Sequence, residues 1–164
     1  MSTKNATITL VGGDMRFEAT VDSGHTIVMD NGDGDTGARP SELVGVALAG
    51  CTAMDVISIL RKKRQQVTGY EVRVSGEQVE HHPNNFTRFD VLHVVDGIDI
   101  DLDAVRRALE LSCTKYCAVG FTLASGGLEI HHGYLVRQPS RDDLRGDVLV
   151  TGPNGAAKVL PAGV

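Results

Sequence analysis

The strongest constraint on the fold is a long segment, residues 43–60, that is apolar or small on every side. Its sequence, LVGVALAGCTAMDVISIL, carries a single charge, at Asp55. A helix that is apolar all round must be covered all round. We therefore expect the rest of the chain and a second subunit to enclose this helix, which predicts a homodimer.

The two ends of this helix are marked by residues that suit helix termini. Pro40 fits the first turn, Ser41 can cap it, and Glu42 favours the positive end of the helix dipole. A basic run at residues 61–64 complements the negative end. The sequence therefore predicts a helix from residue 40 to about residue 64.

Strands are predicted on both sides of the helix, from short β-rich segments separated by turns before it and from segments with period-two alternation after it. These segments cover residues 6–11, 15–20, 25–30, 70–79, 86–96 and 127–137. Glycine and aspartate concentrate in residues 31–39, which predicts a loop.

A second helix is predicted at residues 101–121, where apolar residues recur every three or four positions, with a break expected near residue 113. Strands and helices in this order predict an α+β fold, in which a mainly antiparallel sheet wraps around two core helices. We expect one domain over residues 1–137. The glycine-, proline- and aspartate-rich segment 138–164 is expected to be a C-terminal appendage.

The composition and charge predict a globular protein and argue against nucleic-acid-binding and membrane proteins. With 164 residues, of which 41% are hydrophobic and 23% charged, the chain matches an ordinary globular protein. A net charge of −5 argues against nucleic-acid binding. No stretch reaches the ~20 consecutive apolar residues of a membrane span, and the first residues lack the profile of a secretory leader. We therefore expect no membrane association, a cytoplasmic location, and reduced thiols at all three cysteines.

The three cysteines differ in their surroundings. A free cysteine is usually a small buried hydrophobe, and Cys113 fits that interpretation. Cys51 follows Gly50 in a run of small residues, which lets another element approach its sulfur closely. A reactive thiolate needs a nearby positive charge or a helix N-terminus. Because Cys51 lies three turns inside its helix, a partner side chain is expected to supply that field.

Other candidate ligands predict no metal site. The histidines at residues 81–82 and 131–132 form adjacent pairs, and adjacent residues on a strand point to opposite faces. Neither pair can therefore chelate one metal simply, and we expect surface positions for them. Cys113 and Cys117 lack both C-x-x-C spacing and a third ligand. Asp55, one turn after Cys51, needs a partner if it is buried, and the sequence does not name that partner.

Two motifs together resemble the OsmC/organic hydroperoxide resistance (OsmC-like) family. The first, which resembles the family's central helix, consists of Pro40-x-Glu42-Leu43, Gly50-Cys51, Asp55-Val56 and the basic helix end. The second, which resembles the segment with a second cysteine, consists of His82-Pro83 before Phe86, then Ser112, Tyr116-Cys117 and Val119. The resemblance spans roughly residues 5–137.

The resemblance implies an intertwined homodimer with active sites at the subunit interface and with neither a metal nor an organic cofactor. It implies that Cys51 is the peroxidatic thiolate, which reduces an organic or lipid hydroperoxide in oxidative stress defence. It further implies that Cys117 resolves the oxidised Cys51 as a disulfide. A small dithiol or a lipoyl-bearing protein would then reduce this disulfide.

The chain departs from the better-known hydroperoxide reductases at the head of the central helix. There a glutamate directly after the proline pairs with an arginine that activates the thiolate, and this chain has Ser41. Glu42 is the candidate replacement, although a step of one residue turns a helix by about 100°. Arg16 is the candidate arginine. The chain thus resembles a divergent branch, and a non-catalytic dimer that binds a small apolar ligand in its interfacial pocket is the alternative.

Overall fold

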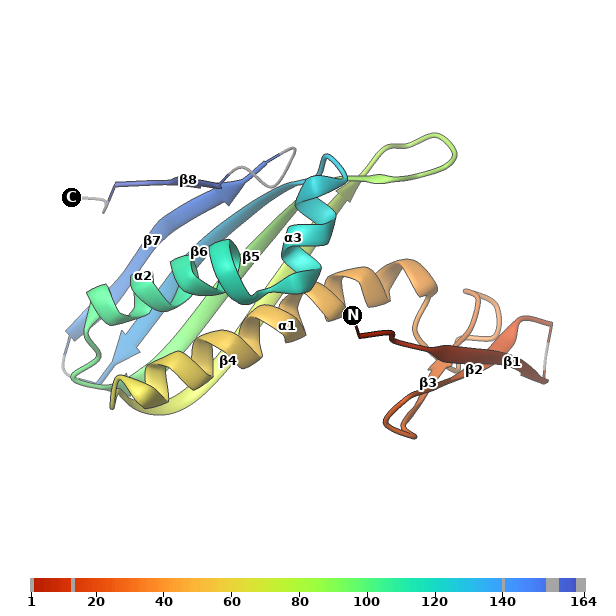
Figure 1. Ribbon diagram of the computed structural model, residues 1–164, viewed down its shortest axis with the longest axis horizontal. Coiled ribbons are helices and arrows are strands. Elements are labelled where there is room, and N and C mark those ends of the chain that lie inside the picture. The colour runs from red at the N-terminus through yellow and green to blue at the C-terminus, as the bar shows by residue number, and fades with distance from the viewer. Residues whose placement is uncertain (1, 13, 140, 153–156, 162–164) are drawn as a thin grey trace. The chain divides into compact units, whose positions relative to one another are not determined.

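The computed structural model describes residues 2–12, 14–139, 141–152 and 157–161 (Figure 1). The chain divides into two compact units, residues 1–44 and 45–164. The first contains a three-stranded sheet and the second a five-stranded sheet. The α+β class expected from the sequence is confirmed.

The first unit is built on an antiparallel meander of β1 (Ala6–Gly12), β2 (Arg16–Val21) and β3 (Thr26–Met29). These strands match the three expected from the β-rich segments near the N-terminus. Several large apolar side chains of this unit remain exposed, among them Ile8, Leu10, Met15 and Ile27.

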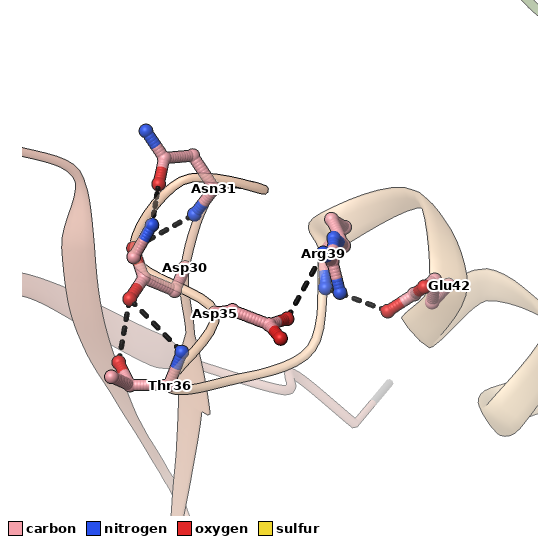
Figure 2. A network of polar contacts seen from close by, with 7 residues as sticks. Asp30, Asn31, Asp35, Thr36, Arg39 and Glu42 are labelled. Atoms are coloured by element: carbon pink, nitrogen blue, oxygen red, sulfur yellow. Dashed lines mark hydrogen bonds and ion pairs between the residues drawn. The ribbon is translucent and has the colours of Figure 1, made fainter.

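A tight loop follows β3 and folds around the carboxylate of Asp30 (Figure 2). This carboxylate accepts hydrogen bonds from the backbone N–H of Asn31 (2.8 Å) and from the Thr36 hydroxyl (2.5 Å). The Thr36 hydrogen bond is the main reason why the pKa of Asp30 lies below its ordinary value. Asn31 Oδ1 also accepts from the Gly34 N–H at 2.8 Å. The glycine- and aspartate-rich segment is therefore the loop that its composition predicts.

The second unit contains a five-stranded sheet in the order of the chain. Its strands are β4 (Gln66–Gln78), β5 (Phe86–Ile98), β6 (Glu129–Gln138), β7 (Arg141–Thr151) and β8 (Ala157–Val159). Neighbouring strands are antiparallel except for β5 and β6, which pair in parallel. This pairing needs a crossover connection, and the helical segment between the two strands supplies it.

The expectation that residues 138–164 form an appendage is wrong for the described part of that segment. β7 pairs with β6 over most of its length, and β8 pairs with β7. Val148 and Leu149 of β7 are fully buried. The first half of β7 is mostly exposed and charged, so only a short apolar run reaches the core. Such a run gives too little alternation to indicate a strand.

Three helices and a π-helical turn cover one face of the five-stranded sheet (Figure 1). They are α1 (Pro40–Lys62), α2 (Leu102–Leu111), the π-helical turn η1 (Ser112–Tyr116) and α3 (Ala118–Ser125). The core between helices and sheet includes Val56, Leu60, Val105, Leu109, Val95, Val136 and Leu149. Both predicted helices are present, and the break expected near residue 113 is the turn η1.

Among the described residues, helix α1 is buried along one side. Its buried residues recur about every fourth position: Gly45, Leu48, Thr52, Val56 and Leu60. On the opposite side Val46 is 60% and Met54 75% exposed, so the described part of the chain does not provide the all-round burial expected from the sequence. With a mean hydropathy of 2.1, α1 is long and apolar enough to cross a membrane, yet it packs as a core helix on the sheet.

A glycine in β5 provides a test of the close approach between β4 and β5. Gly97 is buried, and a Cβ atom there would lie 2.5 Å from the backbone oxygen of Gln66 on β4. Because that oxygen belongs to a paired strand, Gly97→Ala is expected to reduce the free energy of unfolding by about 1–3 kcal/mol. Urea denaturation followed by circular dichroism measures this change. Gly32→Ala is the control, because its nearest neighbour would be 3.8 Å away. Equal midpoints for both variants would contradict the prediction.

Candidate active site around Cys51

Cys51 and Asp55 lie one turn apart on α1 and share a face of the helix, and both are half-buried. The sulfur of Cys51, a carboxylate oxygen of Asp55 and the sulfur of Cys117 all lie within 4.8 Å of one another. Cys117 sits between η1 and α3, far from Cys51 in the sequence. The fold thus brings together the two cysteines that the resemblance pairs, and both are free thiols.

Cys117 is held at the start of α3 in a nearly enclosed position. Its backbone is extended, it forms the N-cap of the helix, and its sulfur accepts a hydrogen bond from the Gly120 N–H at 3.2 Å. The residue is only 4% exposed. Burial, against the opposing effect of the Gly120 hydrogen bond, raises the pKa of the Cys117 thiol to about 12.

Asp55 has a partner that the sequence could not name. The Ser112 hydroxyl donates to Asp55 Oδ2 at 2.9 Å and lies 3.0 Å from the Thr52 hydroxyl. Since a hydroxyl has one proton to donate, Thr52 donates in turn to Ser112. Both hydroxyl residues are fully buried. This chain of hydrogen bonds fixes the position of the Asp55 carboxylate beside the two sulfurs.

Cys113 belongs to the hydrophobic core, and burial raises the pKa of its thiol. Cys113 and Cys117 also line a pocket of about 280 Å³ on the η1–α3 segment. Two partly exposed aromatic residues, Tyr116 and Phe121, line the same pocket.

Glu42 and Arg16, the two candidates for activating Cys51, lie in the first unit and make local contacts. The carboxylate of Glu42 accepts a hydrogen bond from the backbone N–H of Arg39 at 2.8 Å, as a glutamate in the first helical turn often does (Figure 2). Arg16 contacts Glu18 at 3.4 Å. Their expected role toward Cys51 stays a prediction.

Arg39 was not indicated by the sequence pattern, because it stands in a loop that is otherwise rich in glycine and aspartate. Its guanidinium pairs with Asp35 at 3.0 Å (Figure 2). It also lines a pocket of about 530 Å³ in the first unit, whose other lining residues are chiefly apolar: Ile8, Met15, Phe17, Met29 and Pro40, with Asp30, Asn31 and Gly32. A pocket of this kind can hold a small apolar group.

A buried polar cluster crosses β4, β5 and β6. The Tyr70 hydroxyl lies 2.7 Å from His93 Nδ1, and the His93 and His132 rings are 6.4 Å apart. Burial lowers the pKa of His93 to about 3 and that of His132 to about 4. The predicted surface position is therefore wrong for His132, whereas His81 and His82 are exposed as expected.

Comparison with known proteins agrees with the resemblance found in the sequence motifs. The family described as OsmC-like protein matches residues 32–132. Protein YhfA of Escherichia coli K12 is 43% identical over 114 residues, which cover 70% of this chain and 84% of YhfA.

Solved structures extend the similarity to the fold. A hypothetical protein from Aquifex aeolicus VF5 is 25% identical with a TM-score of 0.74, over 85% of this chain and 100% of the other. The organic hydroperoxide resistance protein OhrB of Bacillus subtilis is 18% identical with a TM-score of 0.51, over 81% and 98%, and shares the fold. On the family match and the identity to YhfA, this chain belongs to the OsmC-like protein family.

Proposed function

We propose that this protein is a thiol peroxidase that reduces organic or lipid hydroperoxides in oxidative stress defence. The observation that supports this most directly is the approach of the Cys51 and Cys117 sulfurs to within 4.8 Å of each other. The S–S bond of a disulfide is about 2.05 Å long, so the two sulfurs must approach each other by at most about 3 Å to be joined. Family membership supports a peroxide-related role.

In the proposed reaction the Cys51 thiolate attacks the terminal oxygen of the hydroperoxide. The O–O bond breaks, Cys51 becomes a sulfenic acid, and the alkoxide takes a proton from solvent and leaves as the alcohol. The Cys117 sulfur then attacks the Cys51 sulfur, a disulfide forms, and the hydroxyl group leaves as water. A small dithiol or a lipoyl-bearing protein returns both cysteines to thiols by accepting the disulfide bond.

The proposal includes a cytoplasmic homodimer. Its support is the apolar surface that the chain leaves exposed, on α1 at Val46 and Met54 and on the first unit at Ile8 and Leu10. We also propose that Glu42 is the activating carboxylate and that it acts by binding an arginine, for which Arg16 is the candidate.

The test is mass spectrometry of the reduced protein after one equivalent of an organic hydroperoxide. The expected result is a Cys51–Cys117 disulfide formed within minutes and a matching loss of peroxide. If both thiols stay free while the peroxide persists, the peroxidase function is refuted.

Removing the resolving thiol should separate the oxidation of Cys51 by peroxide from the formation of the disulfide. Cys117→Ser is expected to consume about one equivalent of peroxide without forming a disulfide, because the sulfenic acid then has no neighbouring thiol to condense with. Excess peroxide should convert Cys51 to a sulfinic acid, which mass spectrometry detects as two added oxygen atoms. Cys113→Ala is the control and should form the Cys51–Cys117 disulfide. A disulfide to Cys113 in the Cys117 variant would assign the resolving role differently.

The second candidate function is non-catalytic binding of a small apolar ligand by the dimer. The pocket of about 530 Å³ with its largely apolar lining favours it. A binding protein of this kind would tolerate Cys51→Ser without loss of function.

A further inference from the structure

We propose that reduced Cys51, Asp55 and Cys117 form a three-ligand site for Zn²⁺, and that zinc binding and peroxide reduction exclude each other. The binding half of this inference depends only on the three side chains, while the exclusion half rests on the proposed function. The resemblance implies no resident metal, so the ion proposed here is a regulator that occupies the thiols.

The donor atoms are spaced closely enough for tetrahedral zinc. With Zn–S distances of about 2.3 Å and Zn–O distances of about 2.0–2.2 Å, neighbouring ligand atoms lie roughly 3.3–3.8 Å apart. The three donor atoms here all lie within 4.8 Å of one another. Closing the site therefore requires the donor atoms to approach one another by at most about 1–1.5 Å. Three protein ligands leave the fourth position open for water.

The ligands come from elements that hold them in place. Cys51 and Asp55 stand at i and i+4 on α1, the spacing with which a helix presents two ligands to one zinc ion. Cys117 is fixed at the N-cap of α3. One face of α1 and the start of α3 therefore hold the three ligands in position before an ion binds.

Two contacts support the ligands from outside, as in established zinc sites. The Ser112 hydroxyl donates to Asp55 Oδ2, so the other carboxylate oxygen is left for a metal. The Gly120 N–H donates to the Cys117 sulfur, and the positive end of α3 favours a negative charge there. Two sulfur ligands select soft or borderline ions such as Zn²⁺ over Mg²⁺ and Ca²⁺.

Zinc binding and disulfide formation use the same two sulfurs, those of Cys51 and Cys117, so each process excludes the other. When a peroxide oxidises the site, the two thiolates lose two electrons to the O–O bond and join as a disulfide. The peroxide takes up two protons and yields alcohol and water, and Zn²⁺ leaves without changing its oxidation state. Because both sulfur ligands are lost, oxidation releases the ion, and by linkage the bound ion opposes oxidation.

The test uses Co²⁺ as a spectroscopic probe on the full-length reduced protein, without oxygen. We expect one Co²⁺ per chain with sulfur-to-cobalt charge-transfer absorption, and displacement of Co²⁺ by Zn²⁺. Cys51→Ser is expected to lose the charge-transfer band or weaken binding by roughly 100-fold. Asp55→Asn keeps the shape and an acceptor for Ser112, and should weaken binding by about tenfold or more. Cys113→Ala is the matched control and should bind like the unaltered chain.

A second oxidant keeps this inference separate from the peroxidase proposal. Diamide forms the disulfide by transferring two electrons and two protons from the thiols to its N=N bond, without any peroxide chemistry. Release of Co²⁺ by diamide together with inertness to hydroperoxide would refute the peroxidase and leave the metal site intact. Absence of the charge-transfer band in the reduced protein, or an unchanged band in Cys51→Ser, would overturn the metal site.

Discussion

Replacement of Cys51 by serine is expected to lower the rate of organic hydroperoxide reduction by on the order of 10³-fold or more. A serine hydroxyl is far less ionised than a thiol near neutral pH and is a weak nucleophile toward the peroxide O–O bond. The substitution changes one atom at a half-buried position, so the fold is expected to remain. The measurement is peroxide consumption with a small dithiol as reductant.

The control for this prediction is Cys113→Ala, which removes a core thiol that is not part of the Cys51 cluster. It should retain a rate close to that of the unaltered protein, and circular dichroism should report the same secondary structure for both variants. A Cys51→Ser protein that still reduces hydroperoxides at the original rate would place the nucleophile elsewhere. In that event ligand binding in the apolar pocket becomes the function to test.

The elements of the fold were largely predictable because their signals are local. The ends of α1 follow from Pro40, Glu42 and the basic residues after it, and the helix ends at Lys62. The parallel pairing of β5 with β6 could not be predicted, because a period-two pattern identifies a strand without naming its neighbour. The strand β7 was missed for a related reason, since its first half is charged and its apolar half is short.

The site was predictable only in part. The pairing of Cys51 with Cys117 came from the resemblance, because the two cysteines lie far apart in the sequence. The π-helical turn η1 places one extra residue in the helical path, so helical spacing cannot tell where Cys117 points. Ser112 as the partner of Asp55 depends on the same turn. Contacts between distant segments are decided by the whole fold.

The two adjacent histidines on β6 show how an alternation argument can be right about faces and wrong about burial. His131 is half-buried beside Glu129, and His132 points to the opposite face and is buried. β6 lies in the middle of the sheet, and the residues on its inward face are buried. The sequence alone does not reveal that central position.

Acidification is therefore expected to reduce the stability of this protein strongly between pH 6.5 and pH 4. Burial lowers the pKa of His93 to about 3 and of His132 to about 4, while an unfolded histidine titrates near pH 6.5. Above pH 6.5 both states are neutral and neither histidine affects stability. Below it the unfolded chain binds protons that the native state does not, so each histidine costs about 1.4 kcal/mol per pH unit.

At pH 5 the two histidines together are expected to cost about 4 kcal/mol, a large share of the roughly 5–15 kcal/mol that stabilises a typical domain. Urea denaturation at pH 7, 6 and 5, at one protein concentration, measures this loss. His93→Leu combined with Tyr70→Phe removes both partners of a partly buried hydrogen bond. This double variant should lessen the pH dependence of the unfolding free energy by about 1.4 kcal/mol per pH unit. His81→Gln changes an exposed histidine and should leave the dependence unaltered. Comparing the slopes of the unfolding free energy against pH separates the titration of His93 from any loss of packing. Identical slopes in the unaltered protein and in both variants would show that His93 binds a proton in the native state as it does in the unfolded chain.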